Sequence, residues 1–409
     1  MTLRGPWSPA QRIGELEEEV GMGDSRRVRM GVIGLGLIAQ RVHLPNLAQL
    51  ATLFSVGHVC DLSPALTEAV ADRLPGQVRR STDWRALCDD PDLDALVILT
   101  PGAHGELVAG ALAAGKPVLS EKPLSIKQSE GSQLAAAARR GGHVLQVGYM
   151  KAHDPAMAAA REALWAIGPV RLVRVTVRHP TDARQTDHLG ILRFADADPA
   201  AIAAAAAYAS ERTREALGDV PPGLGWLYRE VLLGSVRHEL AAMLALGLPL
   251  PRSFGHARAW PMDERVPDEP PSVVGHADLG DGAAFELAWM WLPDYPAYDE
   301  RITILGTGGA VSLRMPQPYG PNVSATVTLT LAEGKDVRTT IHASDWDSGF
   351  LRQLRAFHAS VTEGAPVLTD GEGSRDITAS LQALAAAIAR ERGMAVGGEA
   401  AAPVAGLAR

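Results

Sequence analysis

Residues 34–39 read Gly-Leu-Gly-Leu-Ile-Ala and directly follow a short apolar run that begins at Val28. In this G-x-G-x-x-A spacing, the first glycine permits a tight strand-to-helix turn and the second lets the backbone approach a pyrophosphate. The free N–H groups at the start of the following helix favour a phosphate. The alternative is an ordinary tight turn. We expect a dinucleotide to bind at Gly34, Gly36, Leu37 and Ile38.

An acidic residue decides between these alternatives. A second apolar segment, residues 53–60, ends at Asp61. A carboxylate at this point can accept hydrogen bonds from both hydroxyls of the adenosine ribose, and it repels the 2′-phosphate of NADP. We therefore predict NAD as the cofactor, while Ser63 nearby keeps NADP open as the alternative.

A lysine follows a further short apolar segment. Residues 117–120 lead into Glu121, Lys122 and Pro123, and open α/β sheets bind ligands at the carboxyl ends of their strands. An ammonium at this edge can hold a substrate oxygen and stabilise the negative charge that develops on it during hydride transfer. The alternative is a surface lysine that covers a strand end.

The composition excludes several classes of function. The chain has 409 residues, enough for two domains, and its apolar content of 46% is ordinary for a globular enzyme. A net charge of −8 without a basic cluster argues against nucleic acid as a partner. The sequence contains no membrane-length apolar stretch and no secretory signal. Both cysteines, Cys60 and Cys88, are expected to be core thiols. We therefore expect a cytoplasmic protein.

Strands and helices alternate over the first part of the chain. Strands are predicted at 28–33, 53–60, 93–99, 117–120 and 143–147. Short alternating elements of this kind predict a doubly wound parallel sheet with right-handed crossovers. We therefore predict an α/β Rossmann domain over residues 26–150, preceded by a disordered leader over 1–25.

The pattern changes beyond residue 150. Strands follow one another at 170–178, 283–291, 300–305, 310–313 and 325–331, which implies a large, mostly antiparallel open sheet. Helices are predicted over 199–217, 226–245, 349–363 and 376–392. These elements predict an α+β C-terminal domain over 151–392, whose final helices can pack back on the Rossmann domain. A flexible tail is expected over 393–409. The alanine-rich helix 199–217 suggests no function.

Four local patterns, in this order, resemble the Gfo/Idh/MocA family, which is named after glucose-fructose oxidoreductase and inositol dehydrogenase. They are the glycine turn with Asp61, Thr100-Pro101-x-x-His104, Glu121-Lys122-Pro123, and Gly349-Phe350 at the start of a helix. The resemblance is specific over residues 28–155 and thinner beyond. It implies a nicotinamide-dependent oxidoreductase, a C-terminal sheet that forms the substrate wall, and a homodimer or homotetramer.

The resemblance also implies roles for individual residues. It assigns Glu121 to the ribose on the nicotinamide side and places Thr100 and Pro101 beside the cofactor. His104 belongs to the same candidate set, with a helix cap or a packing residue as the alternative. Lys122 becomes the residue that polarises the substrate oxygen.

The family places a second catalytic element, D-x-x-x-H, on a helix of the C-terminal domain. The candidate is His238, because an imidazole can accept a proton from a hydroxyl near neutral pH. The position four residues earlier is Gly234, so the usual aspartate is missing. Either another residue partners His238, or the histidine is structural, or the chain no longer oxidises alcohols. Tyr228 and Glu230 are possible substitutes for the aspartate.

The loop 148–155 leaves the last predicted Rossmann strand, where the family often contacts substrate. Tyr149 and Lys151 offer hydrogen-bonding groups that suit a sugar or polyol, and an exposed crossover loop is the alternative. No metal site is expected, because the later polar cluster lacks zinc-site spacing. That cluster comprises His179, Asp182, Asp187 and His188.

We therefore expect an NAD-linked oxidoreductase that transfers hydride to or from a sugar, cyclitol or related hydroxy or keto compound. One alternative is an enzyme that uses bound NAD transiently to oxidise a sugar, eliminate a group and reduce it again. The other is a non-catalytic NAD-binding regulator, which the glycine at 234 favours and Glu121-Lys122-Pro123 opposes. The expected catalytic residues are Lys122 and His238. The expected substrate contacts are Lys122, Tyr149, Lys151, Tyr228 and His238.

Overall fold

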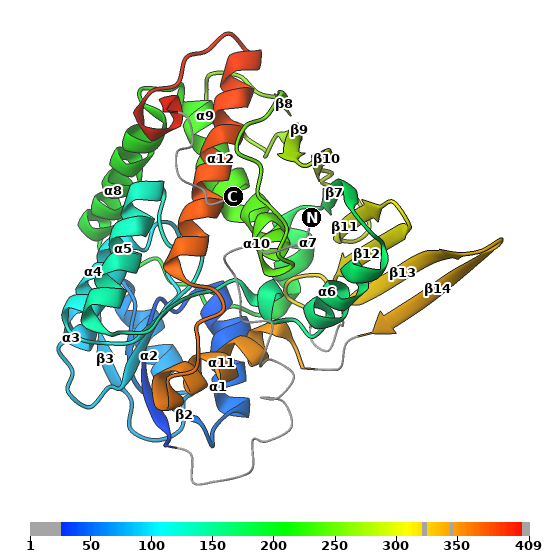
Figure 1. The fold of residues 1–409 in the computed structure, drawn as a ribbon. Helices are drawn as coiled ribbons and strands as arrows, with labels where there is room; N and C mark the ends of the chain where they lie inside the picture. Colours follow the sequence, from blue (N-terminus) through cyan, green and yellow to red (C-terminus); the bar gives the residue numbers. More distant parts are fainter. Residues whose placement is uncertain (1–25, 321–324, 344–346, 403–409) are drawn as a thin grey trace.

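The computed structural model of the protein describes residues 26–320, 325–343 and 347–402. The expected leader over 1–25 and the last part of the expected tail, 403–409, lie outside these residues. Figure 1 shows the N-terminal elements in blue and cyan below a second sheet in green and yellow. Within the described residues, no helix is long and apolar enough to span a membrane.

The first sheet has six parallel strands in the order β3-β2-β1-β4-β5-β6. This order reverses direction between β1 and β4, the point at which doubly wound sheets bind nucleotides. The predicted Rossmann sheet is confirmed, although the short polar β3 was missed. The strands are β1 (Val28–Ile33), β2 (Phe54–Cys60), β3 (Arg79–Ser81), β4 (Ala95–Ile98), β5 (Val118–Ser120) and β6 (Leu145–Val147).

Helices connect these strands, and one of them begins at a residue type that favours a helix start. Helix α2 starts directly after Ser63, whose hydroxyl accepts the N–H of Leu66 at 3.0 Å, the N-cap bond expected of a serine. Both cysteines are buried and free. The helices are η1 (Ala39–His43), α1 (Leu44–Gln49), α2 (Pro64–Ala71), α3 (Arg85–Cys88), α4 (Gly105–Ala113) and α5 (Gln128–Gly141).

The second sheet has eight strands in the order β14-β13-β12-β11-β7-β10-β9-β8. Only β7 and β10 pair in parallel, so the predicted, mostly antiparallel sheet is confirmed. The sequence missed β8, β9 and β14; in β14 nearly every side chain is exposed, so no buried face marks it. The strands are β7 (Val170–His179), β8 (His256–Trp260), β9 (Ser272–Gly280), β10 (Ala283–Trp291), β11 (Asp299–Gly306), β12 (Gly309–Met315), β13 (Thr326–Glu333) and β14 (Asp336–Ala343).

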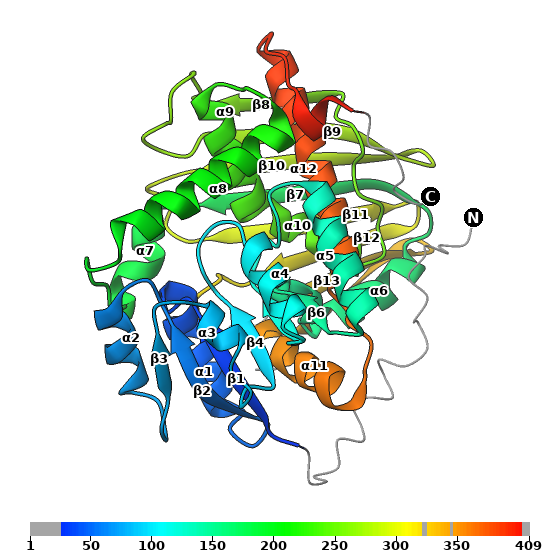
Figure 2. The ribbon, with the colours of Figure 1, turned by 90° about the vertical axis from the view of Figure 1, so that its left-hand side faces the viewer.

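Helices that follow the first sheet in the chain cover both sheets. Leu354 and Phe357 of α11 are fully buried in one cluster with Met30 of β1, and Figure 2 shows α11 beside the N-terminal strands. The helices are η2 (Met150–His153), α6 (Ala156–Ala166), α7 (Asp182–Thr186), η3 (Asp187–Leu189), α8 (Pro199–Leu217), α9 (Pro222–Trp226), η4 (Leu227–Val236), α10 (Arg237–Ala245), α11 (Gly349–Glu363), α12 (Gly371–Glu391) and η5 (Gly398–Ala401).

Part of the expected tail is bonded to the rest of the molecule. The carboxylate of Glu399 accepts the N–H groups of Gln128 at 2.8 Å and Ser129 at 3.2 Å, at the start of α5. The N–H of Gly397 donates to the carbonyl of Leu217 at 2.6 Å. This part of the expected tail therefore contacts the start of α5 and the end of α8, and the Glu399 carboxylate lies where a helix N-terminus stabilises negative charge.

The turn after β1 requires a glycine at position 34. Its φ is +90°, and a Cβ there would lie 2.6 Å from the backbone nitrogen of Thr100 in the loop after β4. A side chain at this position would both strain the backbone and push the two loops apart. Gly34 therefore fixes how closely the loops at the carboxyl edge of the sheet approach each other.

We predict that Gly34→Ala lowers the free energy of unfolding by about 3 kcal/mol or more, since it adds a backbone clash to the cost of a positive φ. Gly102→Ala is the matched control, because Gly102 has a φ of +82° but open space where the Cβ would lie. The control should lose only about 1–2 kcal/mol. Equal losses in urea unfolding would show that the contact with Thr100 does not matter.

Candidate functional site

Asp61 lies directly after β2 and reaches the glycine turn. Its Oδ2 accepts the N–H of Leu35 at 2.8 Å, and its Oδ1 accepts the N–H of Ser63 at 3.0 Å. Each carboxylate oxygen has a second acceptor position, so the group can still accept hydroxyls from a ligand. A Cβ built on Gly36 would meet nothing within 4 Å, so open space lies beside the turn. These features fit the ribose and pyrophosphate of a dinucleotide.

The helix after the glycine turn presents its N-terminus to the same space. The first helical bond runs from the N–H of Gln40 to the carbonyl of Gly36 at 3.0 Å. Leu37 and Ile38 are partly exposed in this first turn, where N–H groups have no partner within the helix. The glycine turn, Leu37, Ile38 and Asp61 therefore meet at one edge of the first sheet.

His104 is completely buried behind the loops after β4 and β5. Its Nδ1 lies 2.6 Å from the carbonyl of Glu121, and its Nε2 lies 2.6 Å from the carbonyl of Thr100. Burial lowers the pKa of this imidazole below its usual value. The structure thus favours a packing role for His104 over contact with a cofactor. Thr100 is partly exposed, and Pro101 is exposed.

Glu121 is held by a residue that sequence reasoning missed. Its Oε1 lies 3.0 Å from Nε2 of buried His43, and its Oε2 accepts the N–H of Lys122 at 3.1 Å. Burial acts to raise the pKa of Glu121, but the hydrogen bond from His43 and the charge of Lys122 bring it below its usual value. The signal was the helical spacing of Ala39 and His43, which puts both on the buried face.

Lys122 connects the edge of the first sheet to the second half of the chain. Its Nζ donates to the carbonyl of Gly234 in η4 at 2.9 Å. Burial lowers the pKa of Lys122; Glu121 opposes this shift, and the charges of Arg237 and Lys151 add to it. The position that holds aspartate in the D-x-x-x-H pattern therefore still contacts a charged side chain, through its backbone oxygen.

His238 lies one turn after Gly234 and is partly exposed. Within the described part of the chain, its buried Nδ1 has no hydrogen-bond partner. Burial, together with the charges of Lys122, Lys151 and Arg237, holds the pKa of His238 well below its usual value. The imidazole is therefore neutral at neutral pH, the form that can accept a proton.

Lys151 forms a buried ion-pair cluster beside this histidine. Its Nζ lies 2.6 Å from Oε2 of Glu300 and 3.1 Å from Oε1 of Glu239, the residue after His238. Tyr298 donates its hydroxyl to Glu300 at 2.6 Å. Burial opposes the charge on Lys151, but the two carboxylates raise its pKa above its usual value. Lys151 is only 5% exposed, and its ammonium is bonded to these two carboxylates.

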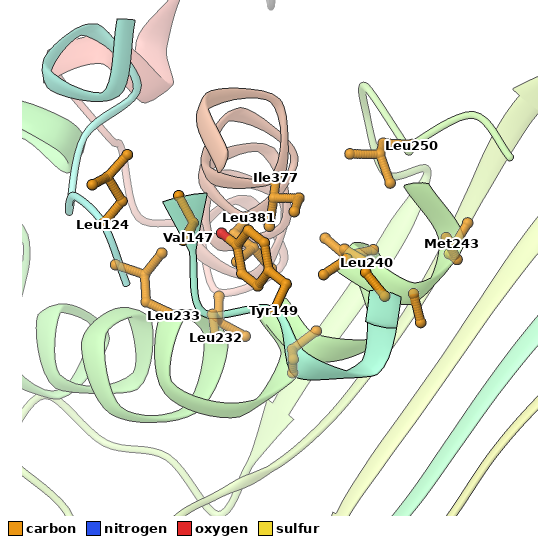
Figure 3. Packing of buried hydrophobic residues seen from close by; sticks show 14 of the residues in the cluster. Leu124, Val147, Tyr149, Leu232, Leu233, Leu240, Met243, Leu250, Ile377 and Leu381 are labelled. Atoms are coloured by element: carbon orange, nitrogen blue, oxygen red, sulfur yellow. The ribbon is translucent and has the colours of Figure 1, made fainter. Parts of the chain in front are cut away.

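The two tyrosines predicted to bind substrate, Tyr149 and Tyr228, both lie in the core of this structure. Tyr149 is 3% exposed; its hydroxyl accepts from Nη1 of Arg237 at 2.8 Å and donates to Ser374 at 3.0 Å. Figure 3 shows its ring among leucines and Ile377. Tyr228 is fully buried and donates to the carbonyl of Ile126 at 2.6 Å. Both hydroxyls satisfy buried polar groups that would otherwise lack partners.

His179, the first residue of the polar cluster and the last of β7, belongs to an aromatic group. The ring of His179 lies 5.3 Å from that of Trp289 and 5.4 Å from that of Trp291, centroid to centroid, and Tyr298 meets it edge-on at 5.5 Å. In residues 26–320, 325–343 and 347–402, no group of three or more His, Cys, Asp and Glu residues is arranged to hold a metal ion. The two tryptophans pack on the sheet, as alternation on one strand predicts.

Comparisons with known proteins agree with this arrangement. Residues 28–149 match the sequence model of a family described as "Oxidoreductase family, NAD-binding Rossmann fold". The chain is 33% identical over 163 residues to an inositol 2-dehydrogenase from Acidothermus cellulolyticus, covering 39% of this chain and 47% of that protein. It is also 33% identical over 170 residues to a dTDP-3,4-didehydro-2,6-dideoxy-alpha-D-glucose 3-reductase from Saccharopolyspora spinosa, covering 40% and 50%.

A similar fold extends over nearly the whole chain. A 3-ketoreductase from Actinomadura kijaniata, solved in complex with TDP-benzene and NADP, superposes with a TM-score of 0.64 at 21% identity, covering 88% of this chain and 97% of that one. The chain spans about half the length of the curated relatives that it matches. The family model thus covers the first sheet, and the fold similarity covers both sheets.

The ion-pair cluster predicts a pH dependence of stability. Burial raises the pKa of Glu239 to about 7; Lys151 opposes the shift and Glu300 adds to it. The folded protein therefore binds this proton more tightly than the unfolded chain, whose glutamate pKa is about 4.3. Stability from this group is full below about pH 4.3 and is lost as the pH rises through about 7.

Glu239→Gln should remove this dependence. Between pH 5 and 7.5 we expect the free energy of unfolding of the unaltered protein to fall by up to about 3 kcal/mol more than that of the variant. Glu106→Gln is the control, because its side chain is 52% exposed. Urea unfolding at several pH values measures both. Parallel pH profiles for Glu239→Gln and the unaltered protein would contradict the assignment.

Proposed function

We propose that the chain is a Gfo/Idh/MocA-type oxidoreductase, which transfers hydride between a nicotinamide cofactor and a sugar-like substrate. The match of residues 28–149 to the family model and the similarity to an inositol 2-dehydrogenase support this proposal. The substrate is a sugar, cyclitol or related hydroxy or keto compound. The observation that carries the proposal is the 2.9 Å contact from Nζ of Lys122 to the carbonyl of Gly234. It brings a lysine at the carboxyl edge of the Rossmann sheet against the turn that precedes His238.

The cofactor is assigned to the edge of the first sheet. The glycine turn and the start of its helix are proposed to bind the pyrophosphate, and Asp61 the adenosine ribose. Thr100, Pro101 and Glu121 follow the next two strands, toward the nicotinamide. When bound, the nicotinamide ring accepts or gives the hydride. The carboxylate of Asp61 supports NAD in preference to NADP.

Two side chains, Lys122 and His238, are assigned the polarisation of the substrate oxygen and the transfer of its proton. Lys122 donates a hydrogen bond to the reacting oxygen of the substrate and stabilises negative charge on it as the C–H bond breaks. His238 takes the hydroxyl proton at a ring nitrogen when the substrate is oxidised, and returns it to the oxygen when a ketone is reduced. The neutral state of the imidazole and the partnerless Nδ1 support this role. Lys151 positions this region through Glu239 and Glu300.

The substrate class is supported by the relatives' names. One similar protein is an inositol 2-dehydrogenase, and another is a 3-reductase of a dTDP-linked deoxy sugar. Both act on ring carbons that carry oxygen. We infer that this chain acts on a secondary hydroxyl or ketone of such a ring.

We predict that Gly36→Ala weakens NADH binding at least about tenfold while leaving the fold intact. A methyl group at this position fills open space that we assign to the pyrophosphate, and it meets no protein atom. Gly255→Ala is the matched control, since a Cβ there also meets nothing within 4 Å. Fluorescence titration with NADH and thermal unfolding measure the two effects. Unchanged NADH binding in Gly36→Ala would place the nucleotide elsewhere or exclude it.

The lysine separates the proposed function from its rivals. Lys122→Ala should reduce kcat at least about a hundredfold and change the Kd for NADH by less than about threefold, because the side chain acts on the substrate oxygen. Lys335→Ala, in the exposed turn between β13 and β14, is the control. The assay follows absorbance at 340 nm with NAD and a panel that includes myo-inositol and dTDP-linked sugars.

Three other outcomes count against hydride transfer with net turnover. Conversion of a sugar without change at 340 nm indicates transient use of bound NAD. NADH binding with no turnover of any substrate, in the unaltered protein and Lys122→Ala alike, indicates a regulator. Turnover that Lys122→Ala leaves unchanged contradicts the role of the lysine.

A further inference from the structure

A segment that follows the Rossmann domain in the chain lies across the adenosine end of the first sheet. Residues 190–198, here called the crossing segment, connect η3 to α8. In Figure 2, α7 and the lower end of α8 lie above α2, at the edge where β2 ends. The crossing segment directly precedes α8, the alanine-rich helix for which the sequence suggested no function.

Hydrogen bonds at two points, Leu192 and Asp196, join the crossing segment to the Rossmann domain. Gln40 donates to the carbonyl of Leu192 at 3.0 Å and accepts its N–H at 2.9 Å, in a reciprocal pair. Four residues on, the carboxylate of Asp196 accepts the hydroxyl of Ser63 and, at 2.8 Å, the N–H of Ala65. Asp196 thus occupies two donors at the start of α2.

These two donors form a site suited to a phosphate. The N-terminus of a helix, with a serine hydroxyl beside its free N–H groups, favours an anion. Ser63 also donates its own N–H to Asp61, the residue assigned to the adenosine ribose. A 2′-phosphate on that ribose would therefore lie within the reach of Ser63 and α2. In this structure an internal carboxylate fills that position.

We propose that Asp196 is a specificity-determining residue, which excludes the 2′-phosphate of NADP by occupying its anion site and by adding a second negative charge near Asp61. The proposal rests on the proposed function and deepens it, because it assigns cofactor choice to a segment outside the Rossmann domain. The hydrogen bond from Ser63 keeps the pKa of Asp196 below its usual value, so the carboxylate is charged at neutral pH.

The charge of Asp196 and its bonds to Ser63 and Ala65 both disfavour a 2′-phosphate. A bound 2′-phosphate would lie near two carboxylates, and it would have to displace Asp196 from Ser63 and Ala65. The ribose of NAD carries a neutral hydroxyl at the same point and leaves those bonds in place. Asp196 therefore disfavours NADP without a cost to NAD.

The test compares NADPH and NADH binding in Asp196→Ser and Asp196→Asn. Removing the charge should lower the Kd for NADPH at least about tenfold and change the Kd for NADH by less than about threefold. Asp187→Asn is the matched control, an exposed acid before the crossing segment; it should change neither value. Asp196→Asn keeps the size of the side chain, so a loss of folding in one variant can be recognised in the other.

The remaining outcomes overturn the proposal in distinguishable ways. If NADH binds and NADPH affinity stays the same in both variants, Asp196 does not select the cofactor. If both nucleotides bind more tightly to the same degree, the crossing segment blocks the site instead of selecting. If neither nucleotide binds even the unaltered protein, the proposed function itself fails.

Discussion

Buried positive charge is the constraint on which the junction of the two sheets depends. Lys122, Lys151 and Arg237 all contribute to the charge around His238. Lys151 is balanced by Glu239 and Glu300, whereas fully buried Arg237 donates to the hydroxyls of Tyr149 and Thr378. Removing such charges from water is costly unless every group finds a partner. In this structure each of the three cations has at least one such partner, and the imidazole beside them is kept neutral.

Segments distant in sequence complete the dinucleotide half. Helix α11 buries Leu354 and Phe357 against the first sheet, Glu399 accepts from the start of α5, and the crossing segment joins Gln40 to Ser63. These contacts couple the cofactor edge to elements of the second half. Binding at that edge can therefore be tuned by residues far from the glycine turn.

The sequence predicted those features that depend only on residues close together in the chain. The glycine turn, Asp61, Lys122 and nearly all the long buried strands follow from local spacing and apolar runs, and each is found where predicted. The fate of Tyr149 and Tyr228 could not be predicted, since their burial depends on Arg237 and Ile126 far along the chain. The same holds for β14, which lacks a buried face. A hydrogen-bond partner that is distant in the sequence leaves no pattern in the residues around Tyr149 or Tyr228.

Hydrogen–deuterium exchange of the nucleotide-free protein, with and without saturating NADH, tests the central claim most directly. The account predicts slower amide exchange at residues 34–40, 61–65 and 100–104, where the turn, the ribose carboxylate and the loop after β4 meet, and no change in the hairpin of β13 and β14. Unchanged exchange at all three segments, with NADH present in excess, would contradict a dinucleotide site at this edge of the sheet.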